Sequence, residues 1–520
     1  MSNSGSRLQK TIINTATGIM NQFCNLILNF LLRTVFIYTL GIQYTGISSV
    51  FTDILTMLSL SELGIGTAIA TALYKPLHDN DQDKIRKLMH FYKQAYRLIA
   101  LFILLVGVAL LPFLDTLITK VPDIQESIYI IFIFYIVKTA ASYLLVYKAT
   151  LLNADQKQYT VKILETICTS LRYITEIVLL LLFKQYLFYL VVEVIAVIIQ
   201  NCIISRQVEK RYPYAFTRTD EQLSVPERRA LFKDIKGLTM FRLSSSVGNS
   251  IDNILISAFI STATAGLLSN YILVRRQLEN LTKQFFSAVI PSIGSLAAEN
   301  NPAKQLSVFN RMFFVCFTVI NFFSVSFFVL INPFISLWLG ETFILDNAVA
   351  FIIAFDLFLY ILLQLIASFR TANAIFVKGQ YRPLITAVLN ILLSVIMIQY
   401  YGIFGTILAT VICRLLTQWY DPYLLYKHIF KISFKKFYLK YWYYMALFFC
   451  SCFITYKAST LLTIGHPIWN FIIKIVCCVL LPNLIVIIFN FHCSELHYVL
   501  ALCTGKLNAL LKYKTKGIKK

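Results

Sequence analysis

The sequence predicts an all-α membrane protein with about fourteen transmembrane helices and with both ends of the chain on the cytoplasmic side. Three observations predict this fold class: the composition, the lengths of the apolar segments and the distribution of charge between them. Of the 520 residues, 58% are hydrophobic and 14% are charged, and the mean hydropathy is +0.70. Because a soluble domain has about 45–50% apolar and about 25% charged residues, this much apolar surface requires lipid. The composition excludes a soluble enzyme, a secreted disulfide-linked domain and a disordered chain.

Fourteen segments are long enough to cross a bilayer as helices, which takes about 20 mostly apolar residues each. Only Lys184-Gln185 separates two of these segments, and Gly402 provides a tight turn between another two. The first segment is too long for the apolar core of a cleavable signal peptide, so we expect it to remain as a membrane helix. The segments are 12–39, 47–72, 98–119, 127–147, 163–183, 186–205, 237–260, 264–290, 312–332, 348–376, 384–401, 403–426, 441–462 and 468–491.

The loops test this helix count, because cytoplasmic loops of membrane proteins are enriched in Lys and Arg. With the N-terminus inside, the inner segments hold 34 basic residues and the outer segments hold three, Lys120, Lys184 and Lys457. A wrong helix count would destroy this alternation. The excess of 47 basic over 25 acidic residues is therefore explained by topology, and no nucleic-acid partner is expected.

A weak internal repeat predicts two pseudo-symmetric lobes of six helices each. Residues 147–159 match residues 369–381 at an offset of 222, and Thr45-Gly46-Ile47 matches Ala265-Gly266-Leu267 at an offset of 220. Parallel repeats of this kind occur in transporters whose two lobes rock around a central site. We expect an N-terminal lobe, a basic cytoplasmic linker, a C-terminal lobe, two additional helices and a basic cytoplasmic tail, over residues 1–205, 206–236, 237–426, 427–492 and 493–520.

Ten basic residues, and eight acidic residues at comparable depth, lie within the apolar segments. There each charge costs at least about 2.5–3.5 kcal/mol unless it faces a cavity or a partner. At about 1.5 Å per residue, Arg33 and Asp53 lie roughly 10 Å below the outer surface, where they could pair. Glu279 follows Arg275 by four residues, one helical turn away on the same face.

These charges concentrate on the first two helices of each proposed lobe, so we expect them to surround a central cavity. The alternative is that they form buried pairs that only stabilise helix packing. The expected substrate-binding residues are Arg33, Arg275, Arg276 and Arg242, and the expected charge-pairing or coupling residues are Asp53, Glu62, Asp252 and Glu279.

A cavity lined by arginines favours an anion, and the planar guanidinium group matches phosphate. Asp252, Glu279 or Glu62 could also titrate and couple transport to protons. Cys450-Ser-Cys452 has no His or carboxylate cluster near it in sequence, so neither a metal nor another cofactor is expected. The outer loops are short and the sequence contains no nucleophile–base pair, so we do not expect an enzyme.

Several separated motifs occur in order along almost the whole chain. They are RTVFIYTLG at 33–41, Tyr44-Thr45-Gly46, LSELGIGTA at 60–68, LYKP at 73–76, DNILIS at 252–257, Ser269-Asn270-Tyr271, NILLS at 390–394 and GIFG at 402–405. In this series the chain resembles polysaccharide flippases of the Wzx type, within the multidrug/oligosaccharidyl-lipid/polysaccharide exporter superfamily.

The resemblance implies a two-lobe fold that alternates between inward- and outward-open states in the bacterial inner (plasma) membrane. It implies that undecaprenyl-diphosphate-linked oligosaccharide is moved from the inner to the outer leaflet for capsule, O-antigen or exopolysaccharide assembly. By position, Arg33, Arg275 and Arg276 would hold the diphosphate. The implied partners are membrane lipids and the polymerase and glycosyltransferases of the pathway. The two extra helices resemble those of lipid II flippases, where a groove accommodates the lipid tail.

Two other functions remain open from the sequence. A cation-coupled multidrug antiporter of the same superfamily should display acids rather than arginines in its cavity. A membrane-embedded polysaccharide polymerase or ligase should carry a sizeable outer loop with catalytic carboxylates or bases. The outer loop of this chain holds Glu341 and Asp346 without a histidine, which is typical of solvated loop acids.

Overall fold

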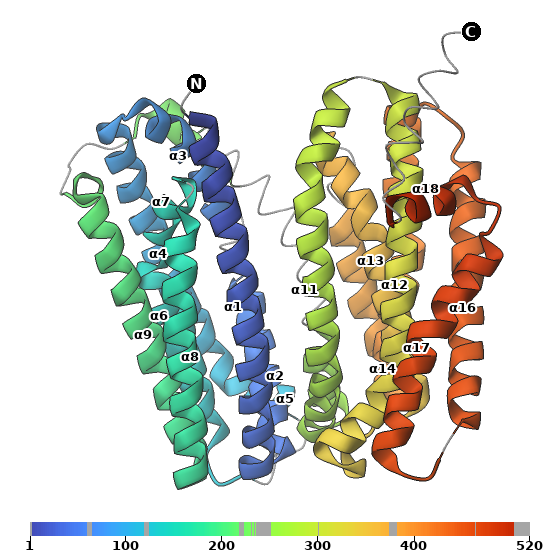
Figure 1. Cartoon of the computed structure of the whole chain (residues 1–520). Helices are drawn as coiled ribbons and strands as arrows, with labels where there is room; N and C mark the ends of the chain where they lie inside the picture. The colour runs from blue at the N-terminus through green and yellow to red at the C-terminus, as the bar shows by residue number, and fades with distance from the viewer. Residues whose placement is uncertain are drawn as a thin grey trace. The chain divides into compact units, whose positions relative to one another are not determined.

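We analysed a computed structural model, which describes residues 3–59, 65–118, 124–155, 157–217, 223–229, 231–232, 235, 251–299, 301–373, 382–462 and 464–503. Helices account for nearly all of the described chain (Figure 1). Within these ranges, nine helices are long and apolar enough to cross a membrane. The chain divides into two compact units, Met1–Ser269 (unit 1) and Asn270–Lys520 (unit 2), which are described separately below.

Unit 1 is built around five long helices, α1, α4, α6, α8 and α9. Helix α1 packs along α8, and α6 packs against both α4 and α9 (Figure 1). Short helices cover one end of this bundle, where buried Tyr92, Tyr96, Tyr143 and Tyr147 form an aromatic cluster. The helices are α1 (Asn3–Leu40), α2 (Ile42–Leu58), α3 (Ile65–Asp79), α4 (Gln82–Leu110), α5 (Leu114–Leu117), α6 (Ile128–Val146), α7 (Ala149–Ala154), α8 (Gln158–Phe183) and α9 (Tyr186–Arg211).

Single residues at helix ends explain several boundaries in unit 1. Gly41 has φ 94°, a conformation that favours glycine, and it separates α1 from α2. Lys184 adopts the left-handed conformation with φ 51° and ends α8, so the predicted Lys184-Gln185 division is confirmed. Asp81 caps α4 by accepting a hydrogen bond from the backbone N–H of Lys84 at 2.9 Å.

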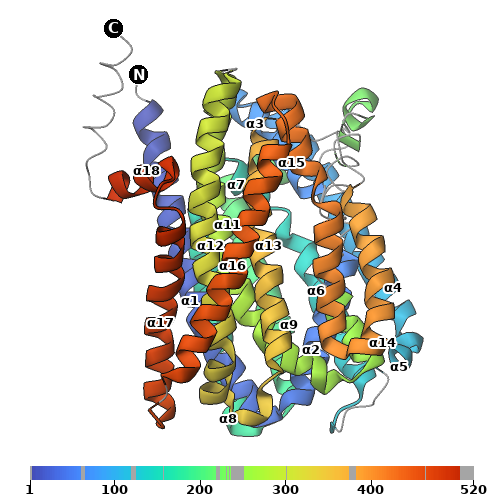
Figure 2. The same cartoon turned by 90° about the vertical axis from the view of Figure 1, so that its right-hand side faces the viewer.

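Unit 2 is organised around α12, which packs against α13, α16 and α17. Figure 2 shows α16 and α17 beside α12, and α16 and α17 also pack on each other. Aromatic side chains fill this core, and the rings of Phe317 and Tyr444 stack with centroids 4.0 Å apart. The helices are α11 (Thr262–Ala298), which begins in unit 1, α12 (Pro302–Leu339), α13 (Asn347–Ala372), α14 (Arg382–Thr417), α15 (Tyr420–Leu425), α16 (Lys435–Leu461), α17 (Pro467–Phe489) and α18 (Ser494–Cys503).

The continuous element α14 is two helices joined at Gly402. This glycine has φ 55° and ψ −135°, which no helix accommodates. The two arms run antiparallel: Asn390 Nδ2 donates to Thr410 Oγ1 at 2.8 Å, and Thr386 Oγ1 donates to Thr417 Oγ1 at 2.8 Å. The tight Gly402 turn expected between 384–401 and 403–426 is therefore confirmed.

Two predicted segments differ from the described helices. The single helix expected over 47–72 is represented by α2 and α3, which lie on either side of residues 60–64, outside the described ranges. The segment at 237–260 lies mostly outside the described residues, and within it 251–259 is helical. The total of fourteen helices, the cytoplasmic termini and the lobe boundaries at 205, 236, 426 and 492 remain predictions.

Candidate functional site

Two glycines bring α2 and the start of α11 into very close contact in unit 1. A Cβ atom at Gly46 would overlap the carbonyl group of Thr262, and one at Gly266 would lie 2.6 Å from the carbonyl oxygen of Ile42. Both crossings therefore require the absence of a side chain. The internal repeat aligns these two glycines with each other. Their close contact also determines where Ser269, one turn after Gly266 on α11, lies relative to α1.

Near this crossing, two predicted site residues have partners on segments far away in sequence. The Arg33 guanidinium on α1 donates to the Ser269 hydroxyl on α11. The buried Asp53 carboxylate on α2 accepts a hydrogen bond from Asn253 Nδ2 at 2.7 Å. Asp252, the neighbour of Asn253, is half-buried. Residues 251–269 thus supply polar groups to both α1 and α2.

A buried network of four charged residues joins α6, α8 and α9 in unit 1, and we call it the unit 1 network. At its centre is Glu193, whose carboxylate lies 2.9 Å from Lys138 Nζ and 3.5 Å from Arg172 Nη1. Arg172 Nε lies 3.7 Å from the carboxylate of Glu176, which is fully buried. Two cations and two carboxylates compensate one another, so the unit 1 network carries no formal net charge.

Tyrosines extend the unit 1 network towards α2. Tyr189 donates to Glu193 at 3.3 Å, and its ring stacks on that of Tyr186 with centroids 5.7 Å apart. The hydroxyl groups of Tyr186 and Tyr135 lie 3.0 Å apart, and Tyr135 donates to the Ser48 hydroxyl on α2 at 2.6 Å. A continuous set of side chains therefore runs from α2 through α6 and α9 to α8.

A second buried network joins α11, α13 and α14 in unit 2, and we call it the unit 2 network. Asp356 is fully buried; one of its carboxylate oxygens lies 2.6 Å from Arg275 Nη2 and the other lies 2.6 Å from Arg414 Nε. Arg275 Nε lies 2.9 Å from the Glu279 carboxylate, which Lys283 approaches at 3.6 Å. The predicted pairing of Arg275 with Glu279 on one helix face is thus confirmed.

The charge balance of the unit 2 network differs from that of the unit 1 network. Arg275, Arg414 and Lys283 face two carboxylates, those of Asp356 and Glu279, so three cations and two anions leave one formal positive charge. The neighbouring Arg276 is exposed on the surface of unit 2. An anion that reached this region would meet a positive field in an apolar setting, where electrostatic attraction is weakly screened.

The predicted site residues thus fall into three groups. Arg33 and Asp53 lie in unit 1 beside the start of α11, and Asp252 lies in the same unit. Arg275 and Glu279 belong to the unit 2 network, and Arg276 is next to them on α11. Glu62 and Arg242 lie outside the described residues.

The predicted list left out the residues that complete both networks: Lys138, Arg172, Glu176 and Glu193 in unit 1, and Asp356 and Arg414 in unit 2. The positions of residues 138, 172 and 193 along their helices could have identified the unit 1 members. At about 1.5 Å per residue, all three lie roughly 10–16 Å from the same end of the bundle. The spacing of Arg172 and Glu176, four residues apart on one helix, is a second signal. Among the described residues, no group of three or more His, Cys, Asp and Glu side chains could hold a metal ion.

No protein-family model matches the chain, and no curated protein sequence matches it significantly. Solved structures do match it. The lipid II flippase MurJ in its inward closed conformation superposes with a TM-score of 0.64 at 16% identity, covering 92% of this chain and 99% of MurJ. The Vibrio cholerae MATE transporter VcmN gives a TM-score of 0.58 at 14% identity, covering 84% of this chain and 99% of VcmN.

A third match is the inward-facing conformation of a multidrug resistance MATE family transporter of the MOP superfamily. It gives a TM-score of 0.57 at 14% identity, and the match covers 78% of this chain and 95% of the transporter chain. At identities this low, the similarity establishes the fold. Together with the nine apolar helices, it supports a multi-pass membrane protein. The chain has the helical membrane fold shared by the lipid II flippase MurJ and by MATE transporters of the MOP superfamily.

Proposed function

We propose that the protein is a flippase of the Wzx type, which moves undecaprenyl-diphosphate-linked oligosaccharide from the inner to the outer leaflet of the bacterial inner membrane. The observation that carries this proposal is the net positive charge of the unit 2 network beside the exposed Arg276. Guanidinium groups bind phosphate with two parallel hydrogen bonds, so this region suits a diphosphate. The MurJ-like fold supports a lipid-linked substrate.

In this proposal, the carboxylates hold Arg275 in place until the substrate arrives. Glu279 pairs with Nε and Asp356 with Nη2 of its guanidinium group, so a phosphate that binds this edge of Arg275 must take over from one of them. Asp356 is also ion-paired with Arg414 and is fully buried, whereas Glu279 is ion-paired with Arg275 across one turn of the same helix. Glu279 is therefore the carboxylate that we expect to yield.

The charge of Glu279 controls how firmly Arg275 is held. A neutral side chain at position 279 would release Arg275 Nε to the substrate and add one positive charge to the unit 2 network. The charged groups of this network around Glu279 are Arg275 and Lys283 on α11, Asp356 on α13 and Arg414 on α14. Replacement of Glu279 by Gln should therefore leave transport active.

The remaining predicted residues have parallel roles in this proposal. Arg33 would meet the diphosphate or an acidic sugar from unit 1, and Arg242 would add a further cation. Asp53, Glu62 and Asp252 would pair with cations or titrate during the cycle. The isoprenoid tail would stay in lipid beside the additional helices α16 and α17, and polymerase and glycosyltransferases would act on either side of the step.

A cation-coupled multidrug antiporter is the second candidate, favoured by the MATE structures of the same fold. The buried Asp53 with its Asn253 partner is the kind of acidic site that a cation would use. Deletion of the gene should increase drug sensitivity if this function is correct, and it should leave drug sensitivity unchanged if the flippase function is correct.

The flippase proposal is tested by complementing a deletion strain with Arg275→Ala and Arg276→Ala variants. Both should abolish polymer export while the amount of protein in the membrane stays at the wild-type level. The exposed Arg206→Ala, at the end of α9, is the matched control and should restore export. Loss of the Arg275→Ala protein from the membrane would instead indicate a role in packing, and normal export by both variants would contradict the proposal.

A further inference from the structure

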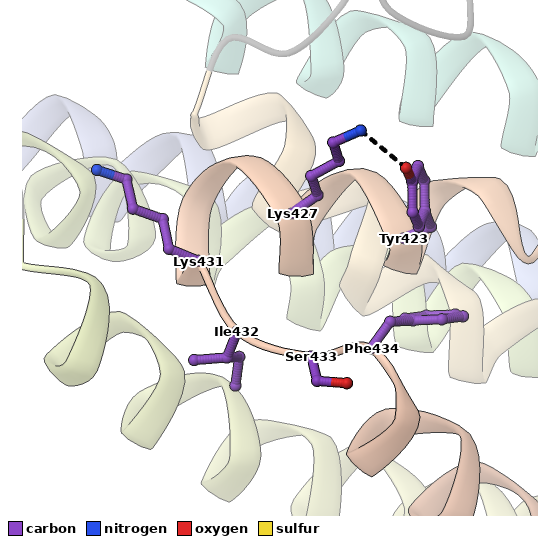
Figure 3. Close-up of a pocket in the computed structure, with 6 residues that line it drawn as sticks. All are labelled: Tyr423, Lys427, Lys431, Ile432, Ser433 and Phe434. Carbon is purple, nitrogen blue, oxygen red and sulfur yellow. Dashed lines mark hydrogen bonds between the residues drawn. The ribbon is translucent and has the colours of Figure 1, made fainter.

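A surface pocket lies where α15 and the following π-helix (Tyr426–Phe430) meet the start of α16. Tyr423, Lys427, Lys431, Ile432, Ser433 and Phe434 line it. In Figure 3 the Lys427 ammonium group points to the Tyr423 hydroxyl, to which it donates at 2.9 Å, and the Lys431 side chain extends in the opposite direction from the end of the π-helix. Two lysines, two residues with hydroxyl groups and two apolar residues therefore line the pocket.

The surroundings of this pocket are strongly cationic. Lys427, Lys431, Lys435 and Lys436 are all exposed, and the chain contains no acidic residue between Asp421 and Glu495. Glu495 pairs with Lys440 at 2.8 Å. Within the described ranges, no carboxylate forms an ion pair with Lys431, Lys435 or Lys436.

The start of α16 adds to this positive field. The helix begins with Lys435 and Lys436 and has no acidic residue in its first turn. Cations at a helix N-terminus are unfavourable because the backbone N–H groups there already carry partial positive charge. A bound anion would relieve this repulsion, and the hydroxyl of Ser433 and the ammonium groups of Lys427 and Lys431 provide donors for it.

Apolar side chains beside the pocket favour a lipid over a soluble anion. Leu439 is 75% exposed and Trp442 is 52% exposed, although both lie in the first two turns of α16. Trp419 stacks on Tyr438 with ring centroids 4.2 Å apart, as in the aromatic belts found at membrane interfaces. The pocket also follows the apolar stretch Leu384–Phe430, so it lies where lipid headgroups are expected.

We propose that this pocket binds the phosphate of an anionic phospholipid, with the lysines on the headgroup and Leu439 and Trp442 against the acyl chains. The site is separate from both buried networks and does not depend on which substrate the protein transports. Clusters of four or more basic residues next to a membrane helix are typical of such lipid binding. The charge of the loops predicts that the lipid belongs to the cytoplasmic leaflet.

Native mass spectrometry of the purified full-length chain with dioleoylphosphatidylglycerol and dioleoylphosphatidylcholine tests this site. We expect preferential binding of phosphatidylglycerol by the wild type and by K427R/K431R. Because each lysine near an anionic lipid contributes about fivefold in affinity, K427Q/K431Q should weaken binding by about 30-fold. The control K184Q/K457Q, which removes two exposed lysines at other helix ends, should bind like the wild type.

Two results would overturn the proposal. One is equal phosphatidylglycerol affinity in the wild type and in K427Q/K431Q. The other is binding of glycerol 3-phosphate as tight as that of phosphatidylglycerol, which would identify a site for a soluble anion. The arginine variant separates loss of charge from loss of folding, since it keeps the charge at both positions.

Discussion

Asp356 holds two arginines from different helices, and its fully buried side chain has no access to solvent. The carboxylate offsets part of the cost of placing Arg275 and Arg414 in an apolar interior. Removing one partner from such a network leaves uncompensated buried charge, which typically costs about 3–5 kcal/mol. The unit 2 network therefore depends more on Asp356 than on its half-exposed member, Lys283.

Replacing Asp356 by Asn should lower the stability of the purified protein by about 3–5 kcal/mol, because two guanidinium groups lose their shared anion. The double variant Asp356→Asn/Arg414→Gln should recover part of this loss, since it removes one of the two uncompensated cations. Thermal unfolding in detergent measures both effects. The exposed loop acid Asp346→Asn is the control, and equal melting temperatures for Asp356→Asn and the control would contradict the expectation.

The contact between α2 and α11 depends on two glycines whose missing side chains let the backbones touch. Gly46 faces the carbonyl group of Thr262, and Gly266 faces that of Ile42. The crossing places Ser269 beside Arg33, so the position of a predicted site residue depends on how closely two helices pack.

Gly46→Ala should destabilise the protein by about 1–3 kcal/mol, because the added methyl group overlaps a backbone carbonyl that cannot move alone. Gly18→Ala is the matched control: it also lies in a long helix, but nothing lies within 4 Å of its added Cβ. There the better helix propensity of alanine should leave stability unchanged or raise it by up to about 1 kcal/mol. If both variants melted at the same temperature, the close crossing would be wrong.

Outside the apolar helices, Glu227 links the helical turn at 225–229 to α4. It pairs with Lys84 and accepts the backbone N–H of Ser224 at 3.1 Å, which lowers the pKa of Glu227 to about 2. A depressed carboxyl pKa adds stability above the ordinary value of about 4.5, and this stability is lost as the pH falls towards 2. The difference in melting temperature between wild type and Glu227→Gln should therefore shrink between pH 6 and pH 3. A constant difference would show that the carboxylate is not held by these bonds.

Local signals explain which helix features could be predicted from the sequence. Gly402 and Lys184-Gln185 are turn signals within otherwise apolar stretches, and both turns occur where expected. Arg275 and Glu279 are four residues apart on one helix, so their pairing needs no knowledge of the tertiary fold. The sequence resemblance to transporters of this superfamily depends on motifs spread along the chain, and the structures of MurJ and of a MATE transporter of the MOP superfamily have a similar fold.

The rest depends on how separate helices pack, which spacing alone does not specify. Asp356 and Arg414 each lie within an apolar segment of the sequence, and the contacts of Asp356 with Arg275 and Arg414 bring together three helices. Likewise, the sequence places Lys138, Arg172 and Glu193 at similar depths but does not show that α6, α8 and α9 adjoin.

The two units carry different charge networks, neutral in unit 1 and positive in unit 2, and this difference is the basis of the proposed transport function. Two aligned residues of the internal repeat form similar ion pairs in the two units. Lys148 and Arg370, which the repeat aligns, are both buried, and they pair with Glu209 on α9 and Asp421 on α15. We propose that these two pairs are equivalent positions of the predicted N-terminal and C-terminal lobes.

A mass-spectrometric inventory of undecaprenyl-linked glycans, in cells with and without this gene, is the most direct test of the flippase function. We predict that a defined undecaprenyl-diphosphate-linked oligosaccharide accumulates on the cytoplasmic side of the membrane when the gene is deleted, and that surface polymer is lost. Wild type and Arg206→Ala should reverse both changes, whereas Arg276→Ala should reverse neither. An unchanged glycan pool together with normal surface polymer in the deletion strain would contradict the flippase function.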